Sequence, residues 1–230
     1  MSMPRFVDHD ARRRHMATTA AELIGTRGLE ALTFRNVAEA AGSSTTVLTH
    51  YFTGKRDLMQ FTFEVVAERS GARFDEALRG GGGLRECLEA ILPLDPERQT
   101  EWRLLTCFWG MAVSDPDMAH AEAQHVRSAQ RRIESLLRHH HPEIPDVELA
   151  ARRLVTLVHG LGAQSALDPD HWSPAEQRRV LAHELGSVGG LGYRDGDESA
   201  SQLQSMTANP EREDNRPVNQ PVLIHGEPGL

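Results

Sequence analysis

Short hydroxyl side chains gather with a histidine and a lysine between residues 44 and 55. Thr45, Thr46 and Thr49 fall on the outward side of one expected helix, together with His50. Small hydroxyls can bond phosphate oxygens or base edges without holding the backbone away from them. These residue types therefore suit contact with a nucleic acid.

Residues 33–52 predict two short helices joined by a tight turn. Thr33 can cap the first helix, and Ser43 or Ser44 the second, because a hydroxyl accepts an unpaired N–H of the first turn. Gly42 suits a left-handed helix end, which needs no Cβ. A second helix of this kind can enter the major groove of DNA. On spacing alone, an ordinary helical corner of an all-α protein fits equally well.

The same stretch resembles the DNA-binding module of the TetR family of one-component repressors, over roughly residues 10–70. The residues that carry the resemblance are Leu32-Thr33, Val37-Ala38, Ala41-Gly42, Ser44 to Leu48, His50-Tyr51-Phe52, Lys55 and Leu58. The chain departs from the family at Ser43, where an aliphatic residue is usual, and at Thr49, where Tyr is frequent. Thr49 changes a side chain that would face DNA, so the family's base preference is not carried over.

The resemblance implies an all-α fold of about nine helices. An N-terminal three-helix head (10–70, with the helix-turn-helix at 33–52) would bind a double-stranded DNA operator. A body (71–190) would bind a ligand and form a homodimer. The helix that begins near Lys55 would link the two, with Lys55 on a backbone phosphate. The DNA-contacting residues would be Thr33, Arg35, Ser44, Thr45, Thr46, Thr49, His50, Tyr51 and Lys55.

Composition agrees with a helical protein. Of 230 residues, 39% are hydrophobic but only 5% are aromatic, so the core must consist mainly of Leu, Val and Ala. The net charge of −8 argues against a protein coated in nucleic acid, although a local basic face is enough for a specific DNA binder. Arg12, Arg13 and Arg14 open the first helix, where phosphate contact and simple solvation are equal alternatives.

Several other functions find no support. Cys87 and Cys107 form neither a disulfide framework nor a metal-ligand spacing. No apolar run approaches the ~18 residues of a membrane span, and the N-terminus lacks a signal sequence, so a cytoplasmic protein is expected. We expect no cofactor, no metal and no catalytic residues. Residues 191–230 are rich in Gly, Pro and polar residues, which predicts a disordered tail.

Two stretches of the body invite a binding interpretation. The resemblance implies a small-molecule pocket, and its lining is expected from the aromatic-rich segment that holds Trp102, Cys107, Phe108 and Met111. The alternative is that these residues form ordinary core. The triplet His139–His141 invites a metal site, but adjacent histidines point in different directions. A helix C-terminus, where histidine complements the dipole, is the preferred interpretation.

The last two expected helices resemble the pair through which the family dimerises as a four-helix bundle. Their apolar stripes, which we expect at the dimer interface, are Leu154, Val158, Leu161, Val180, Leu181 and Leu185. The sequence His159-Gly160-Leu161-Gly162 lies within a helical pattern and follows no strand, so it is not a phosphate loop. Glycine there is expected to permit close approach of another helix.

The sequence therefore predicts a DNA-binding transcriptional regulator, a dimeric repressor that a small molecule releases from its operator. Two alternatives stay open: a DNA-binding regulator without an effector, and a helical protein that binds or converts a small molecule.

Overall fold

The computed structural model describes residues 9–188, and these form nine α-helices with one short 3-10 helix and no β-strand. The all-α prediction is confirmed. The predicted disordered tail (191–230) lies outside the described residues. The helices are α1 (His9–Arg27), α2 (Phe34–Ala40), α3 (Thr45–Tyr51), α4 (Lys55–Arg79), α5 (Leu84–Glu89), α6 (Pro96–Ala112), α7 (Pro116–His140), α8 (Val147–Leu167) and α9 (Pro174–Ser187), with the 3-10 helix at Leu29–Ala31.

Side chains at the caps fix where most helices of the body begin. Asp95, Asp115, Asp146 and Ser173 each accept a hydrogen bond from a backbone N–H in the first turn of α6, α7, α8 and α9, respectively. Three of these helices also start with proline, which has no N–H to leave unpaired. Each such cap typically contributes about 1 kcal/mol to stability.

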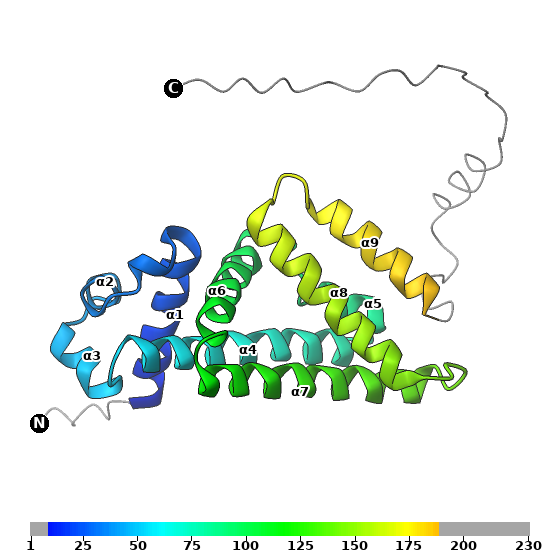
Figure 1. The fold of residues 1–230 in the computed structure, drawn as a ribbon, viewed down its shortest axis with the longest axis horizontal. Coiled ribbons are helices and arrows are strands. Elements are labelled where there is room, and N and C mark those ends of the chain that lie inside the picture. Colours follow the sequence, from blue (N-terminus) through cyan, green and yellow to red (C-terminus); the bar gives the residue numbers. More distant parts are fainter. Residues whose placement is uncertain (1–8, 189–230) are drawn as a thin grey trace, which may run out of the picture. The chain divides into compact units, whose positions relative to one another are not determined.

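The helices enclose two hydrophobic cores. In Figure 1, α4 and α7 lie side by side, α1–α3 gather at one end, and α8 and α9 form a hairpin. The first core joins α1–α3 to the beginning of α4 and to one face of α6. The second core lies among α5, α6, α7, α8 and α9. Helix α4 runs unbroken from the first core to the second, so no break in packing falls at residue 70.

Helix α6 contributes to both cores because its two faces differ. Phe108 is fully buried and stacks on Phe63 of α4, with ring centroids 4.0 Å apart and planes 8° from parallel. Trp102 faces the other way and packs against α8. Its indole Nε1 donates a hydrogen bond to the Ile91 carbonyl (2.9 Å), which fixes the orientation of the ring.

The contact of α6 with α8 requires glycine at position 162. A Cβ built there would overlap the Trp102 ring, whereas one built at Gly160 would meet nothing within 4 Å. The prediction of a close helix approach is thus confirmed for Gly162, while Gly160 lies on the open side of the helix.

This contact predicts opposite effects for two glycine substitutions. Gly162→Ala should lower the free energy of unfolding by about 1–3 kcal/mol, because the ring must shift to admit the methyl group. Gly110→Ala in α6, where a Cβ meets nothing within 4 Å, should instead stabilise by about 0.5–1 kcal/mol through helix propensity. Urea unfolding of both variants measures the difference. Equal stabilities would mean that Trp102 does not pack closely on α8.

Candidate functional site

The helix-turn-helix forms as local sequence rules require. Thr33 Oγ1 accepts a hydrogen bond from the Asn36 N–H (3.1 Å), and Ser44 Oγ from the Val47 N–H (3.2 Å), so both helices are capped. Gly42 has a φ of +61°, the left-handed conformation that the turn needs. Helices of seven residues are not stable alone, so packing must hold them in place.

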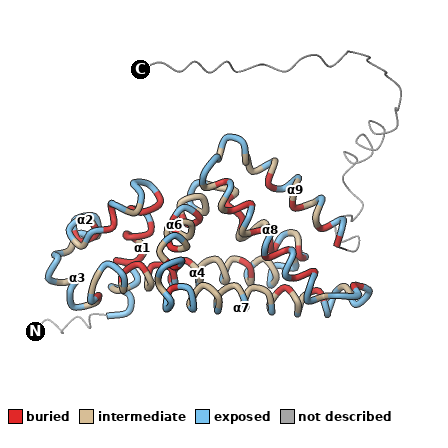
Figure 2. Tube along the Cα trace, viewed as in Figure 1, coloured by how far each residue is buried: buried red, intermediate tan, exposed pale blue. Residues whose placement is uncertain are grey.

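That packing comes from the inner side of α3 and the residues around it. Leu32, Val37, Leu48 and Phe52 are each at most 1% exposed. The outer side of α3 stays in solvent, as the pale blue segments of Figure 2 show. The head therefore presents a rigid helix whose outer side is open to a partner.

The residues predicted to contact DNA divide by what their side chains already do. The Thr33 and Ser44 hydroxyls are occupied as caps, and Thr49 Oγ1 donates to the Thr46 carbonyl (2.8 Å). The Tyr51 hydroxyl lies 3.2 Å from His9 Nδ1, and Lys55 Nζ donates to the Leu29 carbonyl (3.3 Å). Within residues 9–188, the exposed side chains of this set without an intramolecular partner are Arg35, Thr45, Thr46 and His50.

The head carries positive charge although the chain is acidic. Between residues 9 and 60 there are seven Lys or Arg and five Asp or Glu, a net charge of +2 against −8 for the whole chain. Two of these arginines act internally. The Arg13 guanidinium lies 3.9 Å from the Phe61 ring centroid and 3.6 Å from Asp57, and Arg14 pairs with Glu68 at 2.5 Å. Arg13 and Arg14 are still 36% and 51% exposed, so these contacts leave both alternatives, phosphate contact and solvation, open.

The first turn of α4 is tied to the body by one arginine. Arg56 Nη2 donates to Asp115 (2.8 Å) and to Asp117 (2.7 Å), and its Nε donates to Asp115 as well. The guanidinium lowers the pKa of the Asp115 carboxyl well below its usual range through these hydrogen bonds. Asp115 also caps α7, so this contact joins the start of the linking helix to the start of α7.

A cavity of about 470 Å³ opens between α4, α6, α7 and α8. This volume lies within the ~300–1,000 Å³ usual for small-molecule sites. Most of its lining is apolar, with charged residues on α4, α6 and α7. The lining residues are Val66, Ala67, Glu68, Ser70, Gly71, Ala72, Arg73, Phe74, Asp75, Ile91, Glu101, Trp102, Leu105, His125, Ser128, Ala129, Arg132, Ile133, Val158 and His159.

Two histidines at this cavity are uncharged at neutral pH. Burial lowers the pKa of His159 to about 4, with a smaller effect from the nearby His125. Burial also lowers the pKa of His125. The His159 ring lies 6.0 Å from Trp102 and 5.4 Å from Trp109, centroid to centroid. This end of the cavity is therefore aromatic and electrically neutral.

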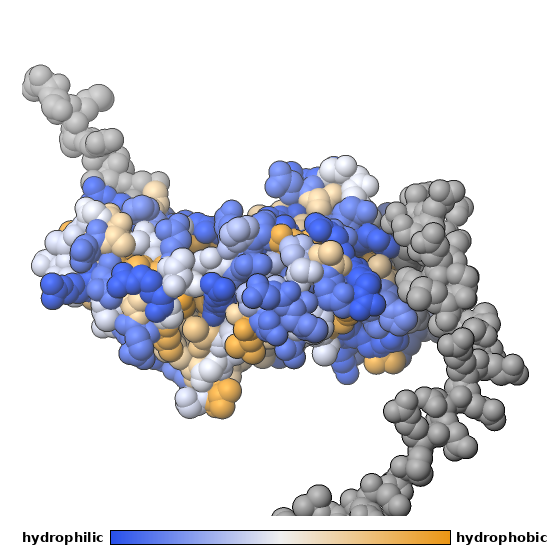
Figure 3. Space-filling model, turned by 90° about the horizontal axis from the view of Figure 1, so that it is seen from above, coloured by the Kyte–Doolittle hydropathy of each residue, from blue (hydrophilic) through white to orange (hydrophobic). Residues whose placement is uncertain are grey.

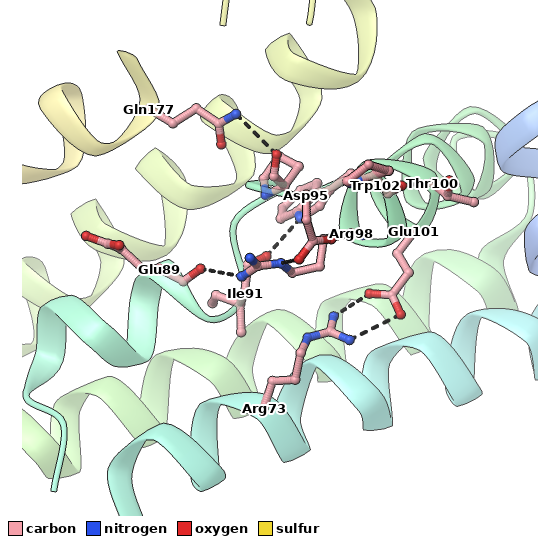
Figure 4. A network of polar contacts seen from close by, with 11 residues as sticks. Arg73, Glu89, Ile91, Asp95, Arg98, Thr100, Glu101, Trp102 and Gln177 are labelled. Atoms are coloured by element: carbon pink, nitrogen blue, oxygen red, sulfur yellow. Dashed lines mark hydrogen bonds and ion pairs between the residues drawn. The ribbon is translucent and has the colours of Figure 1, made fainter. Parts of the chain in front are cut away.

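One buried ion pair crosses the cavity wall. Glu101 of α6 is 6% exposed and accepts hydrogen bonds from both terminal nitrogens of Arg73 on α4 (Figure 4). Beside it, Arg98 donates to Asp95 (2.8 Å) and to the Glu89 carbonyl (2.7 Å), which fixes the turn between α5 and α6. A buried carboxylate without its partner would be costly, so this pair holds α4 and α6 together.

The four residues predicted to line a ligand pocket are not brought together. Trp102 lines the cavity, whereas Cys107, Phe108 and Met111 lie against the first core. The reason is helical geometry. Trp102 and Leu105 share one face of α6, and positions 107, 108 and 111 fall on others. Burial raises the pKa of the Cys107 thiol, which disfavours the reactive thiolate.

The residues predicted at the dimer interface lie inside the protomer. Leu154, Val158, Leu161, Leu181 and Leu185 are at most 3% exposed in the single chain, and Val180 is half-buried. They pack between α8, α9 and the rest of the second core, so they leave almost no surface for a partner. Helix α8 has a broad apolar face because α6, α7 and α9 of the same chain all pack against it.

Polar and charged residues cover most of the face seen in Figure 3, with hydrophobic residues in small groups between them. Among the described residues, the large hydrophobic side chains in solvent are Val113 (90% exposed), Leu149 (51%) and Leu167 (75%). Two of the three lie on α8. They are 18 residues apart, which is five helical turns, so they share one side of the helix with Gly160.

The histidine triplet lies at the end of α7. His139 and His140 close its last turn and His141 follows it, as the helix-dipole interpretation predicts. Within residues 9–188, no group of three or more His, Cys, Asp or Glu side chains could hold a metal ion. Likewise, no helix of this part of the chain is long and apolar enough to cross a membrane.

Sequence reasoning missed most of the polar residues at the cavity. Arg73 and Glu101 are 28 residues apart, and each falls among charged residues typical of a solvated helix face. His125 and Arg132 of α7 carry no local motif either. His159 precedes Gly160 in a helical pattern, and no sequence signal marks it as a cavity residue.

Comparison with known proteins agrees with this arrangement. Residues 18–60 match the family model of bacterial regulatory proteins of the tetR family, and residues 82–190 match the model of the C-terminal part of BetI-type transcriptional repressors. The two matches together span the helix-turn-helix and nearly all of the described body.

Individual relatives support the same assignment. The chain is 29% identical to the HTH-type transcriptional regulator PksA of Bacillus subtilis, over 81% of this chain and 94% of that protein. It is 27% identical to the regulator BetI 1 of Chromohalobacter salexigens, over 79% and 92%.

Solved structures share the fold. A transcriptional regulator from Rhodococcus has a TM-score of 0.70 at 24% identity, over 76% of this chain and 95% of that one. A regulator from Saccharomonospora viridis, solved in complex with choline, has a TM-score of 0.67 at 22% identity, over the same shares. The chain therefore belongs to the TetR family of bacterial regulatory proteins, and it is a DNA-binding transcriptional regulator.

Proposed function

We propose that this protein is a dimeric repressor that a small molecule, bound in the cavity, releases from its operator in the cytoplasm. The observation that carries the proposal is the course of α4. Its first turn follows α3 after a short loop. Of the ten residues from Val66 to Asp75, nine line the cavity. One continuous helix thus touches both the DNA-reading head and the ligand site.

The proposed DNA contact uses the outer side of α3 in the major groove. Thr45, Thr46 and His50 have exposed side chains that are free to meet base edges, and Arg35 is equally free. Lys55 would lose one long hydrogen bond, to the Leu29 carbonyl (3.3 Å), when its ammonium group binds a phosphate. The remaining residues of the predicted set, Thr33, Ser44, Thr49 and Tyr51, would support the helices or add backbone contacts.

The proposed release is mechanical. A ligand between α4 and α7 would alter the position of α4, which Arg56 ties to the start of α7. Each protomer of a dimer must present its α3 at the spacing of the two half-sites. A shift of α4 changes that spacing, so affinity falls without a change at the base contacts. The ligand can shift this equilibrium only by its differential affinity for the two states.

The proposed dimer uses the exposed side of α8 and the adjacent α9. Of the three large hydrophobic residues exposed in the described part of the chain, this side holds two, Leu149 and Leu167, with Gly160 between them. Glycine there would let the symmetry-related α8 approach closely. The contact would be isologous, with the same surface on both protomers.

Operator binding tests the DNA contacts. On an operator selected from random-sequence DNA, Thr46→Ala should cost about 1–3 kcal/mol on the selected site and little on other DNA. Lys55→Ala should weaken binding to all DNA and reduce the slope of log affinity against log salt by about one. Titrations at several salt concentrations measure both effects. A Lys55→Ala protein with altered sequence preference and an unchanged slope would contradict these roles.

The Arg56 contact predicts that operator affinity will fall even when a substitution keeps the positive charge. Arg56→Lys keeps the positive charge but cannot reproduce the fork that holds Asp115 and Asp117 together. Operator affinity should fall about two- to fivefold, the range of an exposed ion pair, while the melting temperature stays nearly constant. Arg79→Lys, at the other end of α4, is the matched control. If both variants bind the operator equally well, the contact does not position the head.

The dimer surface is tested by a charge that the protomer itself can tolerate. Gly160→Glu points into open space in the single chain, but in the proposed dimer it brings two carboxylates together at a buried contact. The variant should sediment as a folded monomer and lose operator affinity, because two half-sites must be held at once. Gly110→Glu in α6 has the same open surroundings and should remain dimeric. A dimeric Gly160→Glu protein would place the interface elsewhere.

A further inference from the structure

The carboxylates at the cavity are already neutralised. Glu101 pairs with Arg73, Asp75 lies 3.5 Å from Arg132, and Glu68 pairs with Arg14. A cation binds most tightly beside a carboxylate that no protein cation already balances, and among the described residues the lining of this cavity offers none. Here it would meet two guanidinium groups in the lining, those of Arg73 and Arg132.

A second hollow of about 530 Å³ adjoins the cavity on its outer side. The two hollows share Ser128 and Arg132, so they are contiguous along α7. Among residues 9–188, no acidic side chain lines this outer hollow. Its lining residues are Leu78, Ser128, Arg131, Arg132, Ser135, Leu136, His139 and His140.

Arg132 stands where the two hollows meet, and α4 is shaped to receive it. Its Nη1 donates to the Gly71 carbonyl (3.1 Å), and its guanidinium lies 5.5 Å from the Phe74 ring centroid. A Cβ at Gly71 would press on that guanidinium. Glycine within a long helix is less stable than alanine. Here glycine leaves the space that the Arg132 guanidinium occupies.

Donors remain for a ligand at this junction. Within residues 9–188, Arg132 Nε and Nη2 make no hydrogen bond, and Arg131 has no partner. Two acidic residues lie on α7 and α4 near these arginines. Glu134 pairs with Arg138 at 3.9 Å, and Asp75 pairs with Arg132 and leaves Arg131 unbalanced. The junction therefore carries an excess of positive charge.

The α6 side of the cavity has the opposite character. Trp102 and Leu105 line it, and the neighbouring His159 is neutral. A site with an apolar aromatic part on α6 and a basic part on α7 suits one chemical class. We propose that the effector is an amphipathic anion, with an aromatic or other apolar body against Trp102 and a carboxylate or phosphate at Arg131 and Arg132. The inference rests on the proposed ligand site, and it predicts weaker binding of a quaternary ammonium such as the choline bound to the Saccharomonospora relative.

A probe series with one common body tests the class. The probes are 4-phenylbutyrate, 4-phenylbutyl phosphate, 4-phenylbutanol and 4-phenylbutyltrimethylammonium, titrated calorimetrically into the full chain without DNA. The two anions should bind more tightly than the alcohol, and the cation least tightly. The two anions also distinguish a carboxylate effector from a phosphate ester.

Variants on α7 locate the anionic end. Arg131→Gln should weaken both anions about two- to fivefold, the range of an exposed charge pair, and leave the alcohol unchanged. Arg127→Gln, an exposed arginine on the same helix outside both linings, should change nothing. Arg132→Lys should retain part of the affinity for phosphate but less for carboxylate, because lysine offers no fork.

Three results would overturn the proposal: a cation that binds as tightly as the anions, no binding by either anion, or an Arg127→Gln effect equal to that of Arg131→Gln. Operator titration with and without the tighter anion separates this inference from the proposed function. Anion binding in the predicted order with unchanged operator affinity supports the ligand class and contradicts ligand-gated release.

Discussion

Helix α6 is packed on both of its long sides, and the positions of the head and of the cavity follow from this constraint. On one side Phe108 stacks on Phe63 and closes the core beneath the helix-turn-helix. On the other side Trp102 lies against α8 at Gly162. A shift of α6 would either open the first core at Phe108 or press the Trp102 ring against the backbone of α8 at Gly162. The head is therefore held by α6 and α4 together rather than joined to the body by a loose linker.

The arginines of this chain serve mainly as ties between helices. Arg13 joins α1 to α4 through Phe61 and Asp57, Arg56 joins α4 to α7, and Arg73 joins α4 to α6. Further out, Arg153 pairs with Glu184 (2.7 Å) between α8 and α9. A planar guanidinium can hold a carboxylate with two hydrogen bonds or lie on an aromatic ring, and an ammonium does neither as well. All but one of the 25 Lys and Arg residues of the chain are Arg, which suits this use.

The cavity is a region where the body core is incomplete. Helices α4 and α7 lie side by side, but small residues such as Ala67, Gly71 and Ala129 face the space between them. The polar groups that enter it are mostly paired with one another, or are histidines kept neutral by burial. Such a space costs packing energy in the empty protein, and a ligand that fills it would recover that energy.

The sequence by itself determined the local elements. The caps at Thr33 and Ser44, the left-handed turn at Gly42 and the helix starts after Asp95, Asp115, Asp146 and Ser173 depend on a few neighbouring residues. For that reason the helix-turn-helix, the all-α fold and the exposed side of α3 could be predicted from spacing and residue type.

Only the tertiary structure decided which residues share a space. Periodicity identified Leu154, Val158 and Leu161 as one apolar face, but not whether a helix of the same chain or of a partner covers it. The aromatic segment of α6 likewise separated, with Trp102 at the cavity and Phe108 in the first core. The charged residues Arg73, Glu101 and Arg132 looked like a solvated surface in the sequence. Their partners lie far away along the chain, and burial depends on all the helices that pack around a position rather than on its neighbours.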